Sequence, residues 1–395
     1  MATLMEKSEQ AQYERRLKRH KRQKLFIIIG IVVLIAGGCV YLINAYVNRV
    51  FNSYDVIKQI ERKDTDSTQY YNYNSGILKV SRDGASAIDE TGNLLFDGSY
   101  TMRNPKVDIC GDYVAVADIG GYDIYVFDGE NSGTKLTVEA PILQVEVAKQ
   151  GVVAVLMEGK DTNTIHLINS KTTSNSLVAD VTTNVYDNGF PVNISLSNDG
   201  KKLVTNYLVV KNGVLESKVT FYNFSEVGQN SVNRLIAMKD YGKKVISRVD
   251  FLNNDTVCVF AEDGIYLYGM PEKVSDIKEI TFDQEIKSVF SNSSHVGVVL
   301  EQGAQENQYQ VLAYDMDGSK VLDQYIDYTY DQVLLTDKEI LFYSEYNCNI
   351  LKLNGVEKFS YTFNSPVSGL FPNNNYNKYM LISDSTIDII KLTEE

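Results

Sequence analysis

The sequence contains no tryptophan and only six prolines, four cysteines and three histidines among its 395 residues. This shortage leaves no CxxC pair and no Cys/His cluster with the spacing of metal ligands. Cys39 lies within a long apolar run, and three widely spaced cysteines, Cys110, Cys258 and Cys348, cannot all pair within one chain. We therefore expect no disulfide framework and no bound metal, and we interpret these three as small buried side chains.

Residues that commonly carry catalysis are equally scarce. After the apolar run the chain offers only His166, in the stretch IHLIN, and His295, after SNSS, and neither has a visible partner. The GxSxG nucleophile motif is absent, and Asn/Asp/Gly turns such as residues 198–200 lack the spacing of a calcium loop. The sequence therefore offers no catalytic, cofactor-binding or metal-binding residue and predicts that the protein is not an enzyme.

Charge is divided unevenly along the chain. Residues 1–24 carry eight Lys or Arg against three Asp or Glu, residues 25–47 carry none, and the whole chain has a formal net charge of -13, which leaves -18 for the remainder. Nucleic-acid phosphates repel so acidic a domain, so we expect no nucleic-acid partner. A basic flank before an apolar run predicts a cytoplasmic N-terminus and an extracellular acidic domain.

The apolar run at residues 25–47, LFIIIGIVVLIAGGCVYLINAYV, predicts a transmembrane helix. About 20 apolar residues suffice to cross a hydrocarbon core of roughly 30 Å. A cleaved signal peptide has an apolar core of roughly 7 to 15 residues that ends in small residues, whereas this run is longer and continues through Tyr41 and Tyr46. We therefore expect a retained anchor and a single-pass protein of the cell membrane.

The pattern of charged, polar and apolar residues along the chain predicts the other domain boundaries. Residues 1–24 form a basic cytoplasmic tail. Residues 48–75 are interpreted as a stalk, because apolar residues with helix-like spacing are followed by the polar stretch DTDSTQ. From Gly76 to residue 395 the chain shows short β-branched runs, such as YVAVAD at 113–118, broken by Gly, Asn and Asp, which is typical of antiparallel all-β structure.

These β-branched runs recur as a degenerate repeat. Three copies align strand for strand, beginning VDICGDYVAVAD at residue 107, VEVAKQGVVAVLM at 145 and VDFLNNDTVCVFAE at 249. Repeats of roughly 40 to 50 residues with four short strands each predict a β-propeller, here with seven or eight blades over residues 76–395. The first copy appears without its first strand and the last copy without its last, so we expect the two ends to complete one another and close the ring.

The strand-turn-strand phrase AIDETGNLLFDG at 87–98 resembles the repeat of quinoprotein-like propellers. The whole layout resembles a membrane-anchored propeller family of uncharacterised function from Gram-positive bacteria, with quinoprotein-like and WD40-like repeats, and the strongest match is at 76–121. This resemblance implies the fold and the topology but supplies no catalytic residues. Quinoprotein dehydrogenases have docking tryptophans and often an adjacent cysteine pair, and this chain has neither, so we expect no cofactor.

Tyrosine is abundant, with twenty-seven residues in a chain without tryptophan. Tyrosine is enriched where proteins bind one another, although it is also an ordinary strand residue that packs in cores. Five tyrosines near the C-terminal part of the chain are candidate binding residues: Tyr325, Tyr328, Tyr330, Tyr343 and Tyr346.

The sequence thus predicts a non-enzymatic binding, sensing or scaffold module at the cell surface. Its partner would be a protein, a peptide or a cell-envelope polymer. The alternative is a hydrolase or lyase that acts on envelope glycan with carboxylates in the propeller channel, and a third interpretation is an assembly factor for a secretion or division complex. Several Asp or Glu side chains around one cavity would favour the hydrolase, whereas an uncharged or plugged channel would favour the binding module.

Overall fold

The computed structural model describes residues 2–62, 64, 67–171, 177–303 and 308–394, and the chain divides into two units, Met1–Val50 and Phe51–Glu395. Met1 of the expected tail and residues 63, 65 and 66 of the expected stalk lie outside the described residues, as do most side chains before residue 24. Each unit is described by itself.

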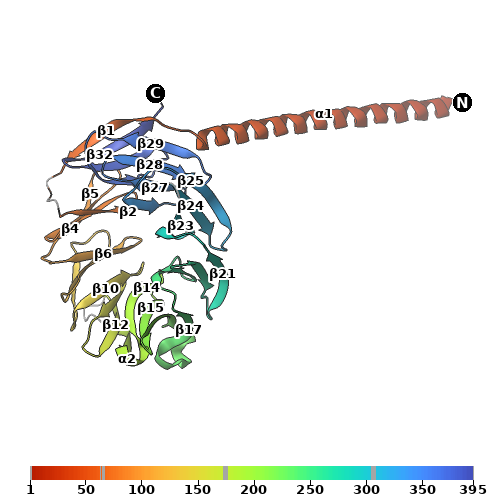
Figure 1. Ribbon diagram of the computed structural model, residues 1–395. Helices are drawn as coiled ribbons and strands as arrows, with labels where there is room; N and C mark the ends of the chain where they lie inside the picture. The colour runs from red at the N-terminus through yellow and green to blue at the C-terminus, as the bar shows by residue number, and fades with distance from the viewer. Residues whose placement is uncertain (1, 63, 65–66, 172–176, 304–307, 395) are drawn as a thin grey trace. The chain divides into compact units, whose positions relative to one another are not determined.

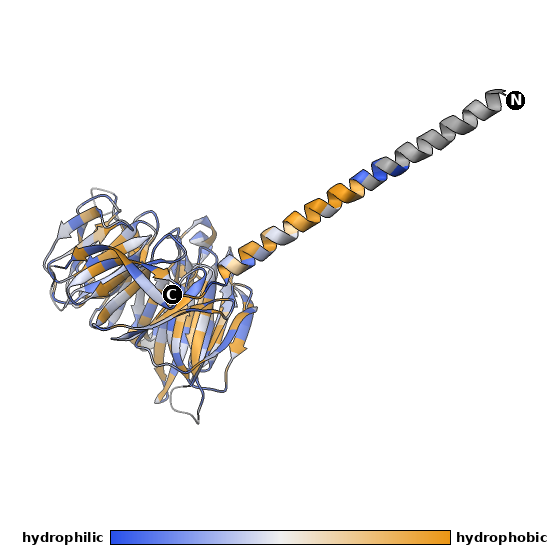
Figure 2. Cartoon of the chain, turned by 90° about the horizontal axis from the view of Figure 1, so that it is seen from above, coloured by the Kyte–Doolittle hydropathy of each residue, from blue (hydrophilic) through white to orange (hydrophobic). Residues whose placement is uncertain are grey.

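The first unit consists of helix α1 (Ala2–Val47). Its stretch Lys24–Val47 is long and apolar enough to cross a membrane, and none of that stretch is buried within the protein. Figure 2 shows a mostly hydrophobic segment of the helix after its basic residues. The stretch is therefore a candidate membrane span, and it includes the apolar run predicted at residues 25–47.

The second unit is an eight-bladed β-propeller, in which each blade is a four-stranded antiparallel sheet (Figure 1). This confirms the all-β propeller and fixes the blade number that the sequence left at seven or eight. The first four blades contain the following strands: in blade 1, β2 (Gln69–Tyr73), β3 (Gly76–Val80), β4 (Gly84–Ile88) and β5 (Leu94–Ser99); in blade 2, β6 (Pro105–Cys110), β7 (Tyr113–Asp118), β8 (Asp123–Phe127) and β9 (Thr134–Thr137); in blade 3, β10 (Ile142–Val147), β11 (Val152–Met157), β12 (Thr162–Asn169) and β13 (Leu177–Asn184); in blade 4, β14 (Phe190–Leu196), β15 (Lys202–Lys211), β16 (Val214–Asn223) and β17 (Leu235–Gly242).

The other four blades follow the same order around the ring. They contain the following strands: in blade 5, β18 (Ile246–Phe251), β19 (Thr256–Ala261), β20 (Gly264–Gly269) and β21 (Ser275–Thr281); in blade 6, β22 (Ile286–Ser291), β23 (His295–Glu301), β24 (Tyr309–Asp315) and β25 (Lys320–Ile326); in blade 7, β26 (Gln332–Leu335), β27 (Glu339–Tyr343), β28 (Asn347–Lys352) and β29 (Glu357–Thr362); in blade 8, β30 (Val367–Pro372), β31 (Lys378–Ser383), β32 (Thr386–Thr393) and, as fourth strand, β1 (Ser53–Glu61).

Strand position within a blade explains the hydrophobic patterning. The second strand of each blade is covered on both faces by neighbouring blades, so it is rich in apolar residues, and every residue of β11 is buried. Fourth strands form the outer edge and are mostly exposed, as β21 is. Apolar residues therefore gather in eight clusters, one between each pair of adjacent blades including blades 8 and 1.

The ring is closed by the N-terminal segment of the second unit. Strand β1 pairs antiparallel with β32 from Ser53 opposite Thr393 to Glu61 opposite Thr386. The backbone N–H of Phe51 also donates to the Lys358 carbonyl oxygen at 2.8 Å, which ties the same segment to blade 7. Closure by strands from both ends is as expected, and it leaves no unpaired strand between the last blade and the first.

The expected stalk at residues 48–75 is corrected by the structure, because β1 and β2 lie within it and belong to the propeller. A bulge between Val56 and Lys58 adds one residue to β1, so its apolar residues no longer alternate and their spacing imitates that of a helix. Strand β2 is the first strand of blade 1, so the first repeat is complete and only the last blade needs a strand from elsewhere.

Blade 4 is larger than the other blades. Its second and third strands, β15 and β16, are ten residues each and meet at a two-residue turn, Asn212-Gly213, where both residues have positive φ as a type I′ turn requires. The short helix α2 (Val185–Asn188) precedes blade 4, and the 3-10 helices η1 (Glu226–Asn230) and η2 (Val232–Arg234) lie between β16 and β17.

Candidate functional site

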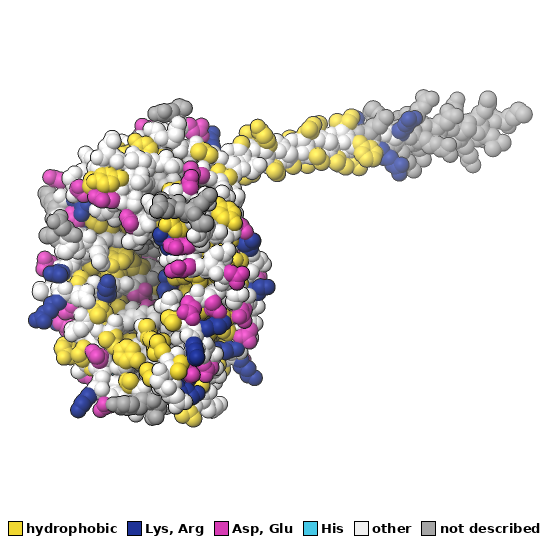
Figure 3. Space-filling view, viewed as in Figure 1, with side chains coloured by type: hydrophobic (Ala, Val, Ile, Leu, Met, Phe, Trp, Pro, Cys, Tyr) yellow, Lys and Arg dark blue, Asp and Glu magenta, His cyan; other side chains and the backbone are white. Residues whose placement is uncertain are grey.

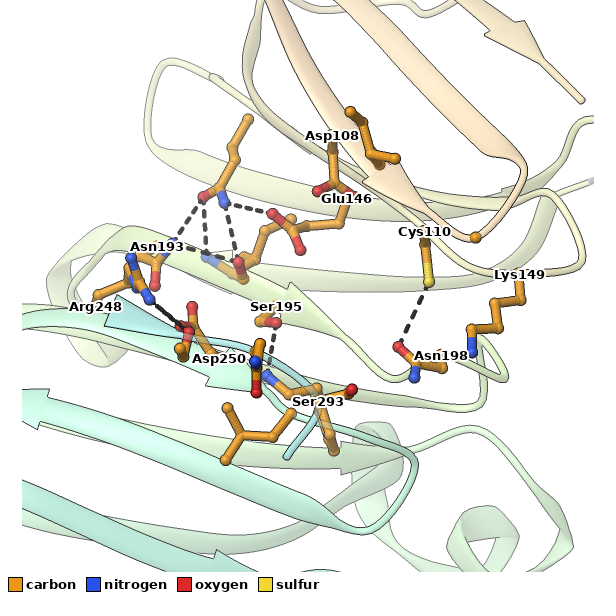
Figure 4. Close-up of a pocket in the computed structure, with 18 residues that line it drawn as sticks. Asp108, Cys110, Glu146, Lys149, Asn193, Ser195, Asn198, Arg248, Asp250 and Ser293 are labelled. Carbon is orange, nitrogen blue, oxygen red and sulfur yellow. Dashed lines mark hydrogen bonds and ion pairs between the residues drawn. The ribbon is translucent and has the colours of Figure 1, made fainter. Parts of the chain in front are cut away.

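A polar cavity of about 570 Å³ lies at the centre of the propeller between the first strands of blades 2 to 6. The turns that follow the first strands also line it, so the cavity extends to the face of the propeller that carries these turns. Figure 3 shows the surface of the propeller hollowed near its middle, and Figure 4 shows the lining side chains. Ten of them are labelled there: Asp108, Cys110, Glu146, Lys149, Asn193, Ser195, Asn198, Arg248, Asp250 and Ser293.

Hydrogen bonds from one blade to the next hold the wall of the cavity. Asp108 of β6 accepts a hydrogen bond from the backbone N–H of Val147 in β10, at 2.6 Å. Gln144 of β10 accepts from the backbone N–H of Ile194 in β14 and donates to the carbonyl oxygen of the same residue, both at 2.9 Å. A first strand has only one strand neighbour, so side chains of the preceding blade satisfy backbone groups that its own sheet leaves unpaired.

The same arrangement recurs one blade further on. Asn193 of β14 accepts from the backbone N–H of Val249 in β18, at 2.6 Å, and Ser195 accepts from the backbone N–H of Phe251, at 2.9 Å. These contacts fix blade 4 to blade 5 in the way that Asp108 fixes blade 2 to blade 3. Repetition of one contact around the ring gives the cavity a preorganised wall.

Asp250 of β18 continues the series with a charged partner. Its carboxylate pairs with Arg248 at 2.5 Å and accepts from the Ser291 hydroxyl of β22 at 2.6 Å, while Arg248 donates to the same hydroxyl at 2.7 Å. The contacts join blade 5 to blade 6. The guanidinium of Arg248 is therefore already bound to Asp250 and Ser291.

Three acidic side chains thus line one cavity, and the charge of Asp250 disfavours the ionisation of Asp108 and Glu146. Burial raises the pKa of Asp108 to about 6, with a further contribution from the nearby Asp250 charge, while the hydrogen bond from Val147 opposes the rise. Burial, then Asp108, then Asp250 hold the pKa of Glu146 well above its usual value. The cavity therefore gathers acidic side chains, and burial and charge repulsion make the ionised forms of Asp108 and Glu146 costly.

Burial disfavours the reactive thiolate form of the three cysteines of the propeller. Cys110 lines the cavity beside Asn198, and burial raises the pKa of its thiol to about 11. Cys258 and Cys348 are fully buried, as expected of structural cysteines, and burial likewise raises the pKa of each thiol. Within the part of the chain that the structure describes, no group of three His, Cys, Asp or Glu side chains is arranged to hold a metal ion.

The five candidate tyrosines do not form one surface. Tyr325 and Tyr346 are exposed, at 60% and 40% of their surface. Tyr330 is buried, donates its hydroxyl to Ser288 at 2.8 Å and belongs to the core between blades 6 and 7, so it is not a surface residue. Tyr328 and Tyr343 are half-buried and pack against the cores on either side of blade 7.

The cavity residues were missed in the sequence, although a signal is present. The three aligned repeats begin VDI, VEV and VDF, and the carboxylates Asp108, Glu146 and Asp250 occupy the same position in each. In a first strand, the apolar residues on either side of this position pack against the preceding blade, so the polar side chain between them lies on the face toward the next blade. Comparing these repeats by position, in addition to their strand pattern, would have predicted the acidic wall.

Residues 47–392 match a protein family described as a family of unknown function, DUF5711. The chain belongs to this family. No curated protein matches the sequence. Membership of DUF5711 agrees with the expected propeller family of uncharacterised function, whereas the expected Gram-positive source and membrane anchor stay predictions.

Solved structures similar to this DUF5711 chain have the same fold at low sequence identity. BamB from Moraxella catarrhalis is 11% identical with a TM-score of 0.50, covering 86% of this chain and 100% of BamB. The computationally designed Ika8 protein is 13% identical with a TM-score of 0.52, covering 87% and 100%. A eukaryotic initiation factor is 11% identical with a TM-score of 0.54, covering 87% and 88%. Identities this low show a shared propeller fold alone.

Proposed function

We propose that the protein is a non-enzymatic binding or scaffold module that receives part of its partner in the central cavity. The observation that supports this proposal most directly is the preorganised wall of the cavity. Repeated hydrogen bonds between neighbouring blades, such as those from the backbone N–H of Val147 to Asp108 and of Val249 to Asn193, hold open a polar cavity of about 570 Å³. A preorganised site loses little conformational entropy when it binds, so rigidity of this kind favours recognition.

The partner in this proposal is a protein, a peptide or a cell-envelope polymer at the cell surface. The acidic composition of the propeller opposes nucleic acid as a partner. Exposed side chains around the ring, among them Tyr325 and Tyr346, supply further contact surface.

We further propose that residues 25–47 anchor the module in the cell membrane, with the N-terminus in the cytoplasm and the propeller outside. Support comes from the exposed apolar stretch Lys24–Val47 and from the basic residues that precede it. Protease added to intact protoplasts should remove the propeller and leave the tail protected. A propeller protected in intact protoplasts and cleaved only after lysis contradicts this orientation.

Site-specific photo-crosslinking in living cells tests the binding proposal. A photoreactive residue placed at Ser293, which lines the cavity, should give a discrete adduct, and the same residue placed at exposed Met238 on outer strand β17 is the matched control. The Ser293 adduct should disappear when Asn198→Arg fills the cavity. Equal labelling from the two positions, or labelling that survives Asn198→Arg, contradicts binding in the cavity.

One observation favours the second candidate, a glycan hydrolase or lyase: Asp108, Glu146 and Asp250 line the same cavity. A carboxyl group with a raised pKa beside an ionised one is the arrangement of a general acid and its partner carboxylate. Against this candidate, Asp108 is held by a backbone N–H of the next blade. Turnover of purified peptidoglycan or teichoic acid by the full-length protein, abolished by Asp108→Asn or Glu146→Gln, would replace the binding proposal with this one.

A further inference from the structure

Of the three carboxylates in the cavity, one has a charged partner and two do not. Asp250 pairs with Arg248 at 2.5 Å. Among the described residues no ion pair is formed with Asp108 or Glu146, and their carboxylates accept hydrogen bonds from neutral groups: Asp108 from the Val147 N–H at 2.6 Å and Glu146 from the Gln144 side-chain amide at 3.0 Å. Both are half-buried, so neither is fully solvated. Carboxylates in this situation are stabilised by a positive charge that enters the cavity.

The size and geometry of the cavity restrict that positive charge. At about 570 Å³ the cavity falls within the range of roughly 300–1,000 Å³ typical of ligand pockets. The described acidic residues are not arranged to surround a metal ion. A side-chain-sized organic cation is small enough for this volume, and the polar side chains Gln144, Asn193 and Ser195 line the same space.

We propose that the central cavity binds an alkylammonium or guanidinium group between Asp108 of β6 and Glu146 of β10. The inference rests on the proposed function, because it names the chemistry that the same cavity recognises. Such a group comes either from a lysine or arginine side chain of the partner or from a free polyamine. In both cases its positive charge supplies the counter-charge that Asp108 and Glu146 do not have among the described residues.

The groups that face these carboxylates predict how binding depends on pH. Asp250 and Arg248 from β18, Cys110 from β6 and Lys149 from the turn after β10 lie around the same space. Asp108 and Glu146 hold protons more tightly than free carboxyl groups do. A cation favours their ionised forms, so its affinity should rise between pH 5.5 and pH 7.5 and protons should be released on binding.

Calorimetry on the full-length protein in detergent micelles tests the inference with three probes. These are spermidine, a Gly-Lys-Gly tripeptide with blocked ends, and the same tripeptide acetylated on the lysine Nζ. We expect the charged tripeptide to bind and the acetylated one to fail. Tighter binding of spermidine would assign the cation to a free polyamine, and preference for the tripeptide would assign it to a side chain of the partner.

Substitutions of side chains that line the cavity test where the cation binds. Asp108→Asn and Glu146→Gln remove charge but keep a hydrogen-bond acceptor, so the fold is retained and affinity for the lysine tripeptide should fall about tenfold for each. Lys149→Gln removes a positive charge at the edge of the cavity and should strengthen binding several-fold. The matched control is Glu279→Gln, an exposed carboxylate on outer strand β21, which should leave affinity unchanged.

The outcomes separate this inference from the proposed function. A Ser293 adduct in cells together with equal affinity for the two tripeptides, or with affinity insensitive to Asp108→Asn and Glu146→Gln, overturns the cation site and leaves cavity binding intact. Loss of the Ser293 adduct together with no binding of any probe overturns both.

Discussion

Lys358 and Glu339 form an ion pair inside the protein, with 2.8 Å between Nζ and Oε2 and only 1% of the lysine side chain exposed. Tyr376 and Tyr379 complete the site. The Tyr379 hydroxyl accepts from Lys358 at 2.7 Å, the Tyr376 backbone carbonyl oxygen also accepts from Lys358, and the ammonium lies 4.1 Å from the Tyr376 ring centroid. Lys358 and Glu339 belong to blade 7 and the tyrosines to blade 8, so this network joins blade 7 to the blade in which the ring closes.

Breaking this pair should be costly. Glu339→Gln leaves the Lys358 ammonium buried without its counter-charge, and removal of one partner of a buried ion pair typically costs about 3–5 kcal/mol. Chemical denaturation of the purified protein should show this loss. The exposed pair Lys320–Asp323 is the control, because Asp323→Asn should cost under about 0.5 kcal/mol. Equal effects of the two substitutions would contradict a buried pair.

Lys352 should destabilise the fold in a pH-dependent way. Burial, then the nearby Lys358 charge, lowers its pKa from 10.5 to about 8. The folded state therefore holds the proton less tightly than the unfolded state, so the penalty is complete below pH 8 and disappears as pH rises from 8 to 10.5. Lys352→Met should be more stable than the natural protein by about 1–3 kcal/mol at pH 7, and by much less at pH 10. A difference that is constant from pH 7 to 10 would argue against this cause.

Asp108→Asn should also stabilise the fold, over another pH range. The folded-state pKa of Asp108 is about 6 against an ordinary 3.8, so the folded protein binds the proton more tightly and loses relative stability as pH rises from about 4 to 6. We expect a gain of about 1–3 kcal/mol at pH 7 that vanishes near pH 4. Thermal melts at both pH values measure it, with Glu279→Gln as the carboxylate that should show neither effect.

Substitutions should distinguish the tyrosine that packs in the core, Tyr330, from the tyrosines that lie on the surface, Tyr325 and Tyr346. Tyr330→Ala removes a buried ring and should cost about 3–5 kcal/mol, whereas Tyr330→Phe loses only the bond to Ser288 and should cost about 1 kcal/mol. Tyr325→Ala, at an exposed position, should change stability by under about 0.5 kcal/mol. If Tyr325→Ala or Tyr346→Ala weakens photo-crosslinking in cells without a change in melting temperature, that residue contacts the partner.

Deleting residues 380–395 should open the ring. The deletion removes most of β31 and all of β32, so β1 loses its only strand neighbour and β30 loses most of its own. The truncated protein should aggregate through unpaired strand edges, which light scattering detects. Deletion of residues 394–395 alone is the control and should leave the protein monodisperse. A soluble, cooperatively melting 380–395 deletion would show that closure does not depend on β32.

The sequence predicted the parts of the fold that depend on local patterning. The apolar runs of the second strands, such as VVAVLM at 152–157, are long because blades cover them on both faces, and they revealed the repeat. Residues 53–61 were misassigned, because an exposed fourth strand with a bulge lacks alternation, and its partner β32 is far away in the sequence.

The candidate site was less predictable, since a side chain's burial depends on blades that the local sequence does not describe. Tyr325 and Tyr330 are five residues apart in a similar setting, yet one is 60% exposed and the other 8%. Asp108 and Asp250 resemble turn residues in composition, and only the ring brings their strands to one cavity.

The pairing of β1 with β32 has a consequence for how the protein is made. The partners Ser53 and Thr393 are 340 residues apart, so β1 is the earliest strand of the propeller to be synthesised and must wait for the last. Blades 1 to 7 can form in order behind it from nearby segments, but loop-closure entropy makes the final pairing slow. An unpaired strand edge therefore persists during translation, and ring closure is the step at which we expect misfolding and chaperone dependence to concentrate.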